Sequence, residues 1–437
     1  MRVWWLTNRL RPLMALLALT GLAGLMLDAS AQQPQEPPKR IQAKPPAKPQ
    51  QPKPGAAAAR QAAKEQAARI EALPPSQVGI GTLAQYAFMV DPQTHTVLLF
   101  KDADKPMAPS SMAKMMTMYL VFEDLAAGKL KMDTRFRVSE RAYNITRGVH
   151  SSTMFLEMTD NPSVLELIQG VIVDSGNDAS VAVAEGMAGS EEAFADRMNK
   201  KAKELGLTGS VFKNASGWPA EGQMVTARDL ALLAWRTIQD FPQYYPYYAQ
   251  REFTFNGKTQ PNRNLELKKV PGVDGLKTGH TEEGGYGQTT SAIRDGRRLI
   301  LVVNGLSTMA ERASETTRLL EWGYRESTNS TIFKAGDTVA EAPVWLGAQD
   351  KVPLVVPQPL QITTLASQPS QPKVVARYDG PLPAPITKGT KLGVAAVTLP
   401  DGRTVEYPLE AGVDVPRMNV FGRIFTLVRY YLLGWLS

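Results

Sequence analysis

The 437-residue sequence contains no cysteine and only three histidines. The absence of cysteine excludes disulfide scaffolds, thiolate zinc sites and cysteine catalysis. His95, His150 and His280 lie far apart in the sequence, without the H-x-x-x-H spacing that places two imidazoles on one helix face. We therefore expect neither a metal site nor another cofactor. The hydrophobic fraction of 43% still allows a sizeable core, and the length favours two or three domains.

The excess of positive charge is confined to the N-terminal part of the chain. The formal net charge is +7. Residues 1–31 contribute +2, from three arginines and one aspartate, and residues 32–75 contribute +5, from eight basic and three acidic residues. Residues 76–437 are therefore neutral. Nucleic-acid binding, which depends on a basic surface, has no support in this part of the chain.

The first 75 residues predict an export signal followed by a spacer. Three arginines precede an apolar stretch of 15 residues, shorter than the roughly 20 that a membrane-spanning helix needs. Ala29-Ser30-Ala31 then offers the small residues that a signal peptidase reads. We interpret residues 1–31 as a signal peptide, with an uncleaved anchor of the same topology as the alternative. Residues 32–75, rich in Pro, Gln, Lys and Ala, predict a disordered spacer.

Residues 76–330 combine strands at both ends with a helical block between them. Strands are predicted at residues 84–90 and 94–100, and a three-strand meander at residues 273–281, 286–294 and 298–304. Helical periodicity dominates residues 110–240, and a closing helix is expected at residues 316–325. This order predicts a sheet whose N- and C-terminal strands pair. The expected fold class is α/β (α+β), with an antiparallel sheet flanked by helices.

The C-terminal part of the chain predicts two further units. Residues 331–415 show short strands separated by turn signals and predict a small all-β domain. Residues 416–437 predict an amphipathic helix whose apolar face carries Val420, Ile424, Leu427, Val428, Tyr431 and Trp435. Arg417, Arg423 and Arg429 flank that face. We expect this tail to lie on a membrane surface; the alternative is a terminal helix packed against the protein core.

A serine and a lysine three residues apart begin the most apolar helical run. From Pro109 to Phe122 the sequence is apolar on every side, which predicts a buried helix that starts near Ser110. Ser111 and Lys114 share one face of its first turn. Desolvation disfavours the lysine cation, so a neutral amine would lie beside a serine hydroxyl, as a general base beside a nucleophile.

Two further motifs follow in order, Ser175-Gly176-Asn177 between predicted helices and Lys277-Thr278-Gly279 on the first strand of the meander. Each is weak alone: Asn177 could simply cap a helix, and Lys277 could be an exposed strand lysine beside a bulge glycine. The S-x-x-K pattern also recurs at Ser210 and Ser370, where neither opens a buried helix. The ordered triplet S-x-x-K, S-x-N and K-T-G is far more specific.

With this triplet, residues 76–437 resemble the low-molecular-mass D-alanyl-D-alanine carboxypeptidases, which are penicillin-binding proteins. Other segments that carry the resemblance are Pro109–Thr117, Met154–Leu156, Ser175–Asp178, Thr226–Ala231, Asn262–Asn264 and Leu276–Thr281. The sequence departs from the family at Met112-Ala113, commonly Leu-Thr, and at Gly287, commonly larger. The resemblance implies a β-lactamase/transpeptidase-like domain that removes the terminal D-Ala of peptidoglycan pentapeptides through an acyl-enzyme and binds penicillin covalently. It places the enzyme at the periplasmic face of the cytoplasmic membrane.

The resemblance also implies a role for each motif residue. Ser111 would be the acylated nucleophile, Lys114 its base, and Ser175 a proton relay. The residues implied to bind substrate or support the site are Asn177, Lys277, Thr278, Gly279, His280 and Arg312. The backbone N–H groups of Ser111 and of a residue just after Gly279 would form the oxyanion hole.

The alternatives are a β-lactamase-like hydrolase, a D,D-endopeptidase and a non-catalytic wall-peptide binding module. A β-lactamase needs a second carboxylate for deacylation, and the segment 204–208 lacks the expected E-x-x-L-N pattern. A D,D-endopeptidase would use the same acyl-enzyme, and a non-catalytic wall-peptide module would need none of the chemical residues. The expected partners are peptidoglycan stem peptides, β-lactams and, through residues 416–437, the inner-membrane surface. The oligomeric state is not predicted.

Overall fold

The structure, a computed structural model, describes residues 80–366, 373–398 and 404–433. The predicted signal peptide at 1–31 and the spacer at 32–75 lie outside the described residues, as do Ser370 and Trp435. Their assignments stay predictions.

A five-stranded antiparallel sheet forms the centre of the N-terminal domain, in the order β2-β1-β7-β6-β5. Its strands are β1 (Tyr86–Asp91), β2 (Thr96–Lys101), β5 (Val273–Thr281), β6 (Gly285–Arg294) and β7 (Arg297–Leu306). The predicted pairing of early and late strands is confirmed, because β1 pairs with β7 with Phe88 opposite Val302. Strand β5, which carries the K-T-G motif, lies at one edge of this sheet.

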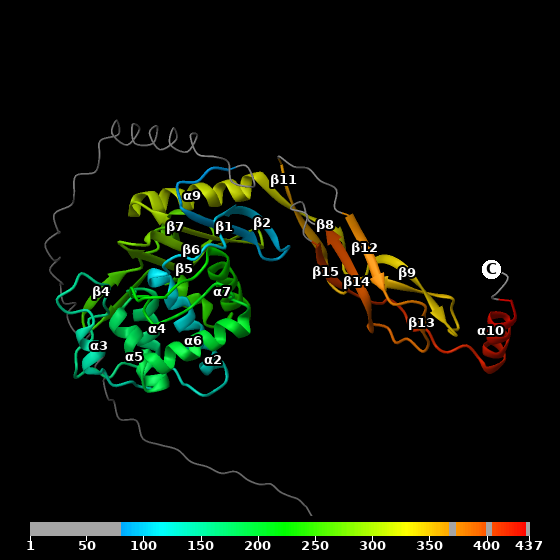
Figure 1. Cartoon of the computed structure of the whole chain (residues 1–437), viewed down its shortest axis with the longest axis horizontal. Helices are drawn as coiled ribbons and strands as arrows, with labels where there is room; N and C mark the ends of the chain where they lie inside the picture. Colours follow the sequence, from blue (N-terminus) through cyan, green and yellow to red (C-terminus); the bar gives the residue numbers. More distant parts are fainter. Residues whose placement is uncertain (1–79, 367–372, 399–403, 434–437) are drawn as a thin grey trace, which may run out of the picture. The chain divides into compact units, whose positions relative to one another are not determined.

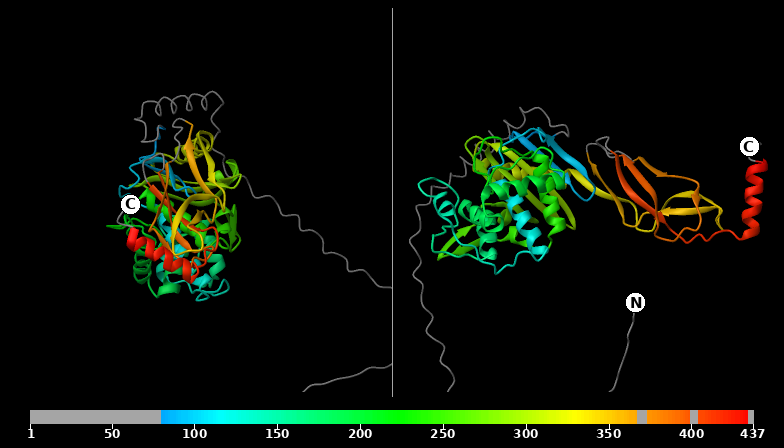
Figure 2. Two further views of the ribbon diagram at one scale, coloured as in Figure 1. Left: turned by 90° about the vertical axis from the view of Figure 1, so that its right-hand side faces the viewer. Right: turned by 60° about the horizontal axis from the view of Figure 1, so that its bottom comes forward.

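Alternation along the strands divides the core between the two faces of the sheet. Phe88, Ile300 and Val302 belong to the core shared with the helical block, whereas Leu301 and Val303 pack with the final helix α9 (Met309–Glu326). Figures 1 and 2 show α9 on one face and the helices between α2 and α7 on the other. Helix α9 begins earlier than the apolar pattern predicts because Thr308 caps it and accepts a hydrogen bond from the Glu311 backbone N–H.

The helical block is inserted between β2 and β5. Its elements are η1 (Ser110–Ala113), α2 (Lys114–Ala126), α3 (Glu140–Asn144), α4 (Val164–Ile172), α5 (Asn177–Ala188), α6 (Glu191–Leu205), α7 (Ala227–Asp240), η2 (Tyr245–Ala249), β3 (Glu252–Phe255), β4 (Lys258–Pro261) and α8 (Glu266–Lys269). Helix α2 is buried on all sides from Lys114 to Phe122, as its apolar sequence predicts. The block therefore holds the start of α2 rigidly next to the sheet.

The C-terminal domain is all β, as predicted. Strand β8 (Ser327–Phe333) pairs with β11 (Leu360–Leu365). A six-stranded sheet has the order β12-β14-β15-β10-β9-β13, formed by β9 (Thr338–Trp345), β10 (Lys351–Val355), β12 (Lys373–Tyr378), β13 (Leu382–Pro383), β14 (Lys391–Thr398) and β15 (Thr404–Ala411). Its core is separate from that of the N-terminal domain and includes Val352, Leu354 and Leu409.

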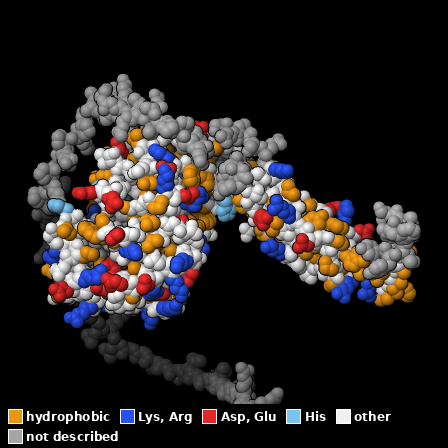
Figure 3. Space-filling model, viewed as in Figure 1, with side chains coloured by type: hydrophobic (Ala, Val, Ile, Leu, Met, Phe, Trp, Pro, Cys, Tyr) orange, Lys and Arg blue, Asp and Glu red, His pale blue; other side chains and the backbone are white. Residues whose placement is uncertain are grey.

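The described chain ends in helix α10 (Val420–Leu433). Phe421 is 85% exposed and Phe425 is 70% exposed, and Ile424 and Val428 are exposed beside them. Figure 3 shows hydrophobic side chains gathered at this end of the molecule. Among the helices within residues 80–433 that the structure describes, none is long and apolar enough to cross a bilayer.

Candidate active site

Ser111 and Lys114 meet at the junction of η1 and α2. Ser111 lies in the 3-10 turn, Lys114 is the first residue of α2, and the Lys114 Nζ–Ser111 Oγ distance is 2.9 Å. Lys114 Nζ also lies 2.6 Å from Asn177 Oδ1 and 2.6 Å from the Ser216 carbonyl oxygen. As an ammonium, Lys114 donates to all three oxygens. As an amine it has two N–H donors for Asn177 and Ser216, so its lone pair is left to accept the Ser111 hydroxyl proton.

Burial makes the amine form of Lys114 accessible near neutral pH. The side chain is fully buried, and desolvation lowers the pKa of Lys114 from 10.5 to about 7, with the Arg263 cation adding to the effect. Asp178 and Glu191 act in the opposite direction. The lysine that the sequence identified as a candidate base is thus poised to exchange a proton with its serine neighbour.

The other S-x-x-K matches lack this geometry. Ser210 lies outside the helices and donates to Asp229 Oδ2 at 2.7 Å, while Lys213 is exposed. Ser370 lies outside the described residues. Within the described ranges, the pair at 111 and 114 is the S-x-x-K match that opens a buried helix.

The loop that presents the Ser216 carbonyl is held from two helices. Thr117 of α2 donates to the Ala215 carbonyl oxygen at 2.6 Å, and Glu191 of α6 accepts from the Ala215 backbone N–H at 3.0 Å. Gly217 follows in a left-handed conformation with φ of +78°, and a Cβ there would collide with the Ser110 carbonyl oxygen. Only glycine therefore allows the loop to pass this close to the serine turn.

The S-G-N motif forms the turn that begins α5. Gly176 is the N-cap and Asn177 is the first helical residue, so the interpretation of Asn177 as a helix cap is wrong. The Asn177 side chain instead turns toward Lys114. The next residue, Asp178, accepts from the backbone N–H groups of Met154 and Leu156. These two bonds hold the segment 154–156 against the start of α5.

Lys277 reaches the S-G-N turn from the edge strand β5. It is 3% exposed, and its Nζ donates to Ser175 Oγ at 2.9 Å, so the reading as an exposed strand lysine is wrong. Burial lowers the pKa of Lys277 well below its ordinary value, with the cations Lys114, Arg263 and Arg312 contributing and Asp174 opposing. The structure thereby links the third motif to the second, and the second to the first through Asn177.

The remaining predicted residues lie along β5 and α9. Thr278 is buried, and Gly279 packs so closely on the serine turn that a Cβ would lie 2.9 Å from Ser110 Cβ. His280 is exposed and stacks on Tyr286, with ring centroids 3.8 Å apart. Arg312 is 4% exposed, donates from Nη2 to the Arg263 carbonyl oxygen at 3.1 Å, and has no partner for Nε among the described residues. An anion entering the site would find this donor unoccupied.

Two residues of the site, Arg263 and Asp174, were not identified as site residues from the sequence. Arg263 donates from Nε to the Asp174 carbonyl oxygen at 3.2 Å. Asp174 is buried, its Oδ1 has no partner among the described residues, and burial raises the pKa of its carboxyl group to about 7. The N-R-N segment carries the family resemblance without assigning a role to Arg263, and a lone aspartate before S-G-N forms no pattern. Only the tertiary structure brings them to Lys277.

The two departures from the family pattern are neighbours in space. A Cβ on Gly287 would lie 2.7 Å from Met112 Cε and would overlap the Asn304 side chain. Met112 is fully buried, and Asn304 donates from Nδ2 to the Ala108 carbonyl oxygen at 3.2 Å. The long methionine at 112 therefore occupies the space that a larger residue at 287 would need.

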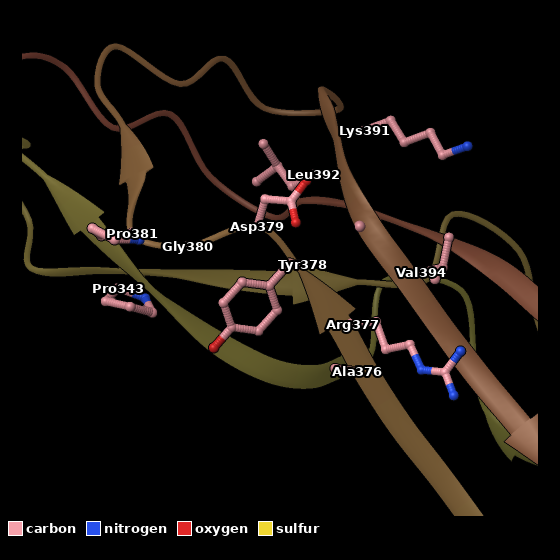
Figure 4. Close-up of a pocket in the computed structure, with 11 residues that line it drawn as sticks. Pro343, Ala376, Arg377, Tyr378, Asp379, Gly380, Pro381, Lys391, Leu392 and Val394 are labelled. Atoms are coloured by element: carbon pink, nitrogen blue, oxygen red, sulfur yellow. The ribbon is translucent and has the colours of Figure 1, made fainter.

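A groove of about 930 Å³ in the C-terminal domain has no comparable chemistry. It is lined by the ends of β12 and β14 and by Pro343, and Figure 4 shows Tyr378 beside Pro343. Arg377, Asp379 and Lys391 are its charged residues, and none is paired there with a serine. Across the described residues, no group of three or more His, Asp or Glu side chains could hold a metal ion. The candidate active site is therefore the cluster around Ser111 and Lys114.

Replacing Asp174 by Asn should stabilise the protein more at pH 8 than at pH 5. The pKa of Asp174 is raised from 3.8 to about 7 on folding, so the folded state holds a proton that the unfolded state has lost in this window. The free energy of unfolding contributed by this group therefore falls as pH rises from about 4 to about 7. Urea unfolding at both pH values measures the difference, with the exposed Asp133→Asn as the control. A gain that is the same at both pH values would contradict it.

The comparisons with known proteins agree with this geometry. A profile of the D-alanyl-D-alanine carboxypeptidase family matches residues 75–308, and a profile of the penicillin-binding protein 5 C-terminal domain matches residues 328–417. The D-alanyl-D-alanine carboxypeptidase DacF of Bacillus subtilis is 37% identical over 340 residues, which cover 76% of this chain and 86% of the relative. DacA of Escherichia coli, also named a D-alanyl-D-alanine carboxypeptidase, is 36% identical over 359 residues, covering 80% and 88%.

Solved structures show the same architecture. Penicillin-binding protein 5 from Haemophilus influenzae superposes with a TM-score of 0.69 at 34% identity, covering 79% of this chain and all of that one. The family profile spans more than half of the chain, and both domains have a counterpart among known proteins. The chain belongs to the D-alanyl-D-alanine carboxypeptidase family.

Proposed function

We propose that this protein is a serine-type D-Ala-D-Ala carboxypeptidase in which Ser111 is the nucleophile and Lys114 its general base. The observation that carries the proposal is the position of Lys114 Nζ, which lies within 2.9 Å of Ser111 Oγ while two other oxygens hold it in place. A buried lysine with a pKa of about 7 can accept the serine proton near neutral pH.

Acylation begins when the Lys114 amine takes the Ser111 hydroxyl proton and Oγ attacks the carbonyl carbon between the two D-Ala residues. The backbone N–H groups of Ser111 and of a β5 residue just after Gly279 would stabilise the oxyanion. The C–N bond then breaks, and the proton that Lys114 took from Ser111 passes through the Ser175 hydroxyl to the leaving nitrogen, so Lys114 is an amine again. Ser175 Oγ is held by Lys277, from which it accepts at 2.9 Å. The products are free D-Ala and an ester on Ser111.

Deacylation repeats these steps with water as the nucleophile. Lys114 takes a proton from water, the hydroxide oxygen attacks the ester carbonyl, and the proton returns to Ser111 Oγ as the ester bond breaks. A β-lactam would acylate Ser111 in the same way, by opening of its ring amide. In that case the leaving nitrogen stays tethered to the acyl group.

Cationic side chains would bind the carboxylate of the terminal D-Ala. Burial is the largest cause of the lowered pKa values of Lys114, Lys277 and Arg312, and the Arg263 cation lowers all three further, which indicates an accumulation of positive charge around the site. Arg312 Nε, which has no partner in the described part of the chain, and the buried hydroxyl of Thr278 add hydrogen-bond donors. Asn177 would hold the substrate backbone. His280 is proposed only to support β5, since it stacks on Tyr286.

Penicillin should add one covalent adduct to the wild-type protein and to Ser210→Ala, and none to Ser111→Ala. Intact-mass spectrometry measures the adduct, and release of D-Ala from a pentapeptide precursor should be lost in the same variant. A cross-linked peptide dimer tested in parallel measures endopeptidase action through the same acyl-enzyme. Labelling that survives Ser111→Ala would show that the nucleophile is elsewhere.

The acylation rate should rise with pH through about 7, because only the amine form of Lys114 can accept the serine proton. Lys114→Arg should abolish acylation, since a guanidinium keeps its proton at this pH. Stopped-flow measurement of penicillin acylation between pH 5 and pH 9 tests both, with Lys213→Arg as the matched control. A flat profile, or an active Lys114→Arg variant, would rule out this base.

We divide the proposed enzyme into five consecutive segments. We assign residues 1–31 to a signal peptide, 32–75 to a spacer, 76–330 to the catalytic domain, 331–415 to the β domain and 416–437 to a membrane-binding tail. The exposed apolar face of α10 supports the last assignment. The enzyme would then work at the periplasmic face of the cytoplasmic membrane.

A chain that ends at Val415 should remain in the soluble fraction and still be acylated by penicillin. In the full chain, Leu427→Glu should release more protein from membranes than Arg423→Gln. Apolar burial is expected to supply most of the affinity, whereas each arginine adds only about 1 kcal/mol near an anionic surface. Co-sedimentation with vesicles that contain anionic lipid measures both. Sedimentation of the shortened chain would assign membrane binding to another segment.

A further inference from the structure

The buried carboxyl group of Glu266 has no part in the proposed mechanism. Glu266 is the first residue of α8, and its side chain is fully buried. Its Oε2 accepts from Gln288 Nε2 at 2.9 Å, whereas its Oε1 is buried with no hydrogen-bond partner in the described part of the chain. A carboxylate held away from water is unfavourable unless a cation compensates it. This burial therefore requires a cation nearby.

Glu266 lies on the same side of the sheet as helix α9. Gln288 is on β6 opposite Val303 of β7, and Val303 belongs to the face of the sheet that packs with α9. Side chains directly opposite each other on neighbouring strands share one face, so the Gln288 amide and the Glu266 carboxylate that it holds are on this side. Helix α8 also contacts α9. Arg312, in the first turns of α9, is a buried cation of that helix.

Arg312 is the cation on which Glu266 acts. Burial lowers the pKa of Arg312, and the Arg263 cation lowers it further, whereas the Glu266 carboxylate and then Tyr286 oppose this shift. The Arg312 guanidinium donates from Nη2 to the Arg263 carbonyl oxygen at 3.1 Å, and its Nε has no partner among the residues that the structure describes. Glu266 therefore offsets the burial of a guanidinium that still has a donor available for an anion.

Asn264 fixes the carboxylate relative to the strand that carries the K-T-G motif. Its Oδ1 accepts from Gln288 Nε2 at 3.0 Å and from the Glu266 backbone N–H at 3.2 Å. Its Nδ2 donates to the Gly275 carbonyl oxygen on β5 at 3.1 Å, two residues before Lys277. Glu266 is thus held by both its backbone and its side chain, in a fixed relation to the substrate-binding strand.

We propose that Glu266 is a positioning residue for substrate binding, whose buried carboxylate holds the Arg312 guanidinium in place so that its Nε–H can bind the carboxylate of the terminal D-Ala. The inference rests on the proposed function, in which Arg312 binds that carboxylate. Without the Glu266 charge, Arg312 would lose the carboxylate that offsets its burial, while Arg263 would still repel it. The long arginine side chain would then move toward solvent and away from the substrate.

The first test is Glu266→Gln, which removes the charge and retains the size of the side chain. Stopped-flow acylation over a range of penicillin concentrations separates the dissociation constant of the initial complex from the limiting acylation rate. The dissociation constant should rise about tenfold, the size of effect expected for the loss of one hydrogen bond to a charged group. The limiting rate should stay unchanged, because Ser111 and Lys114 are not altered. Glu266→Asp retains the charge and should keep the dissociation constant close to the wild-type value.

A double-mutant cycle tests whether Glu266 acts through Arg312. Arg312→Gln should itself raise the dissociation constant, and adding Glu266→Gln to it should cause no further rise. Glu315→Gln is the matched control, since Glu315 is an equally buried carboxylate on α9 that pairs with Arg318 at 2.9 Å. It should leave penicillin binding unchanged even where urea unfolding shows a loss of stability.

An unchanged or lowered dissociation constant in Glu266→Gln, or additive losses in the double variant, would overturn the positioning role while penicillin acylation stands. If Glu266→Gln does not fold, Gln288→Met takes its place, because it removes the donor to Glu266 Oε2. That variant should raise the dissociation constant in the same direction by a smaller factor, and no rise would equally overturn the inference. Absence of a penicillin adduct in the wild type would instead refute the proposed function itself.

Discussion

The fold depends on the burial of one cationic side chain. Lys114 is the first residue of a helix that is buried on all sides, and it is fully buried itself. Removing a lysine from water is unfavourable unless its N–H groups are satisfied or it loses its proton. The oxygens that satisfy it come from α5 and from the 214–217 loop, so both elements must reach α2. The positions of Thr117, Glu191 and Gly217 all serve this convergence.

The same burial creates an electrostatic imbalance within the protein. Lys277, Arg263 and Arg312 gather near Lys114, whereas the carboxyl group of Asp174 has a raised pKa and one oxygen without a partner among the described residues. Such an arrangement is less stable than a compensated one, since buried charges without partners reduce the free energy of unfolding. It suits a site whose ligand is an anion, because binding then supplies the missing charge. Stability and substrate recognition therefore oppose each other at this cluster.

Sequence patterns predicted what local periodicity and motif order can encode. The meander strands predicted at 273–281 and 286–294 and the buried run after Pro109 appear in the structure as expected. Helix starts are harder to predict from the sequence. Thr308 caps α9 before the apolar pattern of that helix begins, and the Asn177 side chain contacts Lys114, 63 positions away, instead of capping its own helix. The partners of Asp174 and the hydrogen bond from Gln288 to Glu266 arise from contacts between distant segments. No local pattern encodes them.

The packing of Met112 against Gly287 constrains how this sequence can diverge. A side chain cannot be added at position 287 while the methionine and Asn304 fill that volume, and a smaller residue at 112 alone would leave a hole beside the serine turn. The effects of the two substitutions are therefore non-additive. A larger side chain at position 287 needs space from both Met112 and Asn304, so a shorter residue at 112 is one of the changes that must come first. The order in which mutations are acquired therefore limits which site shapes this sequence can reach.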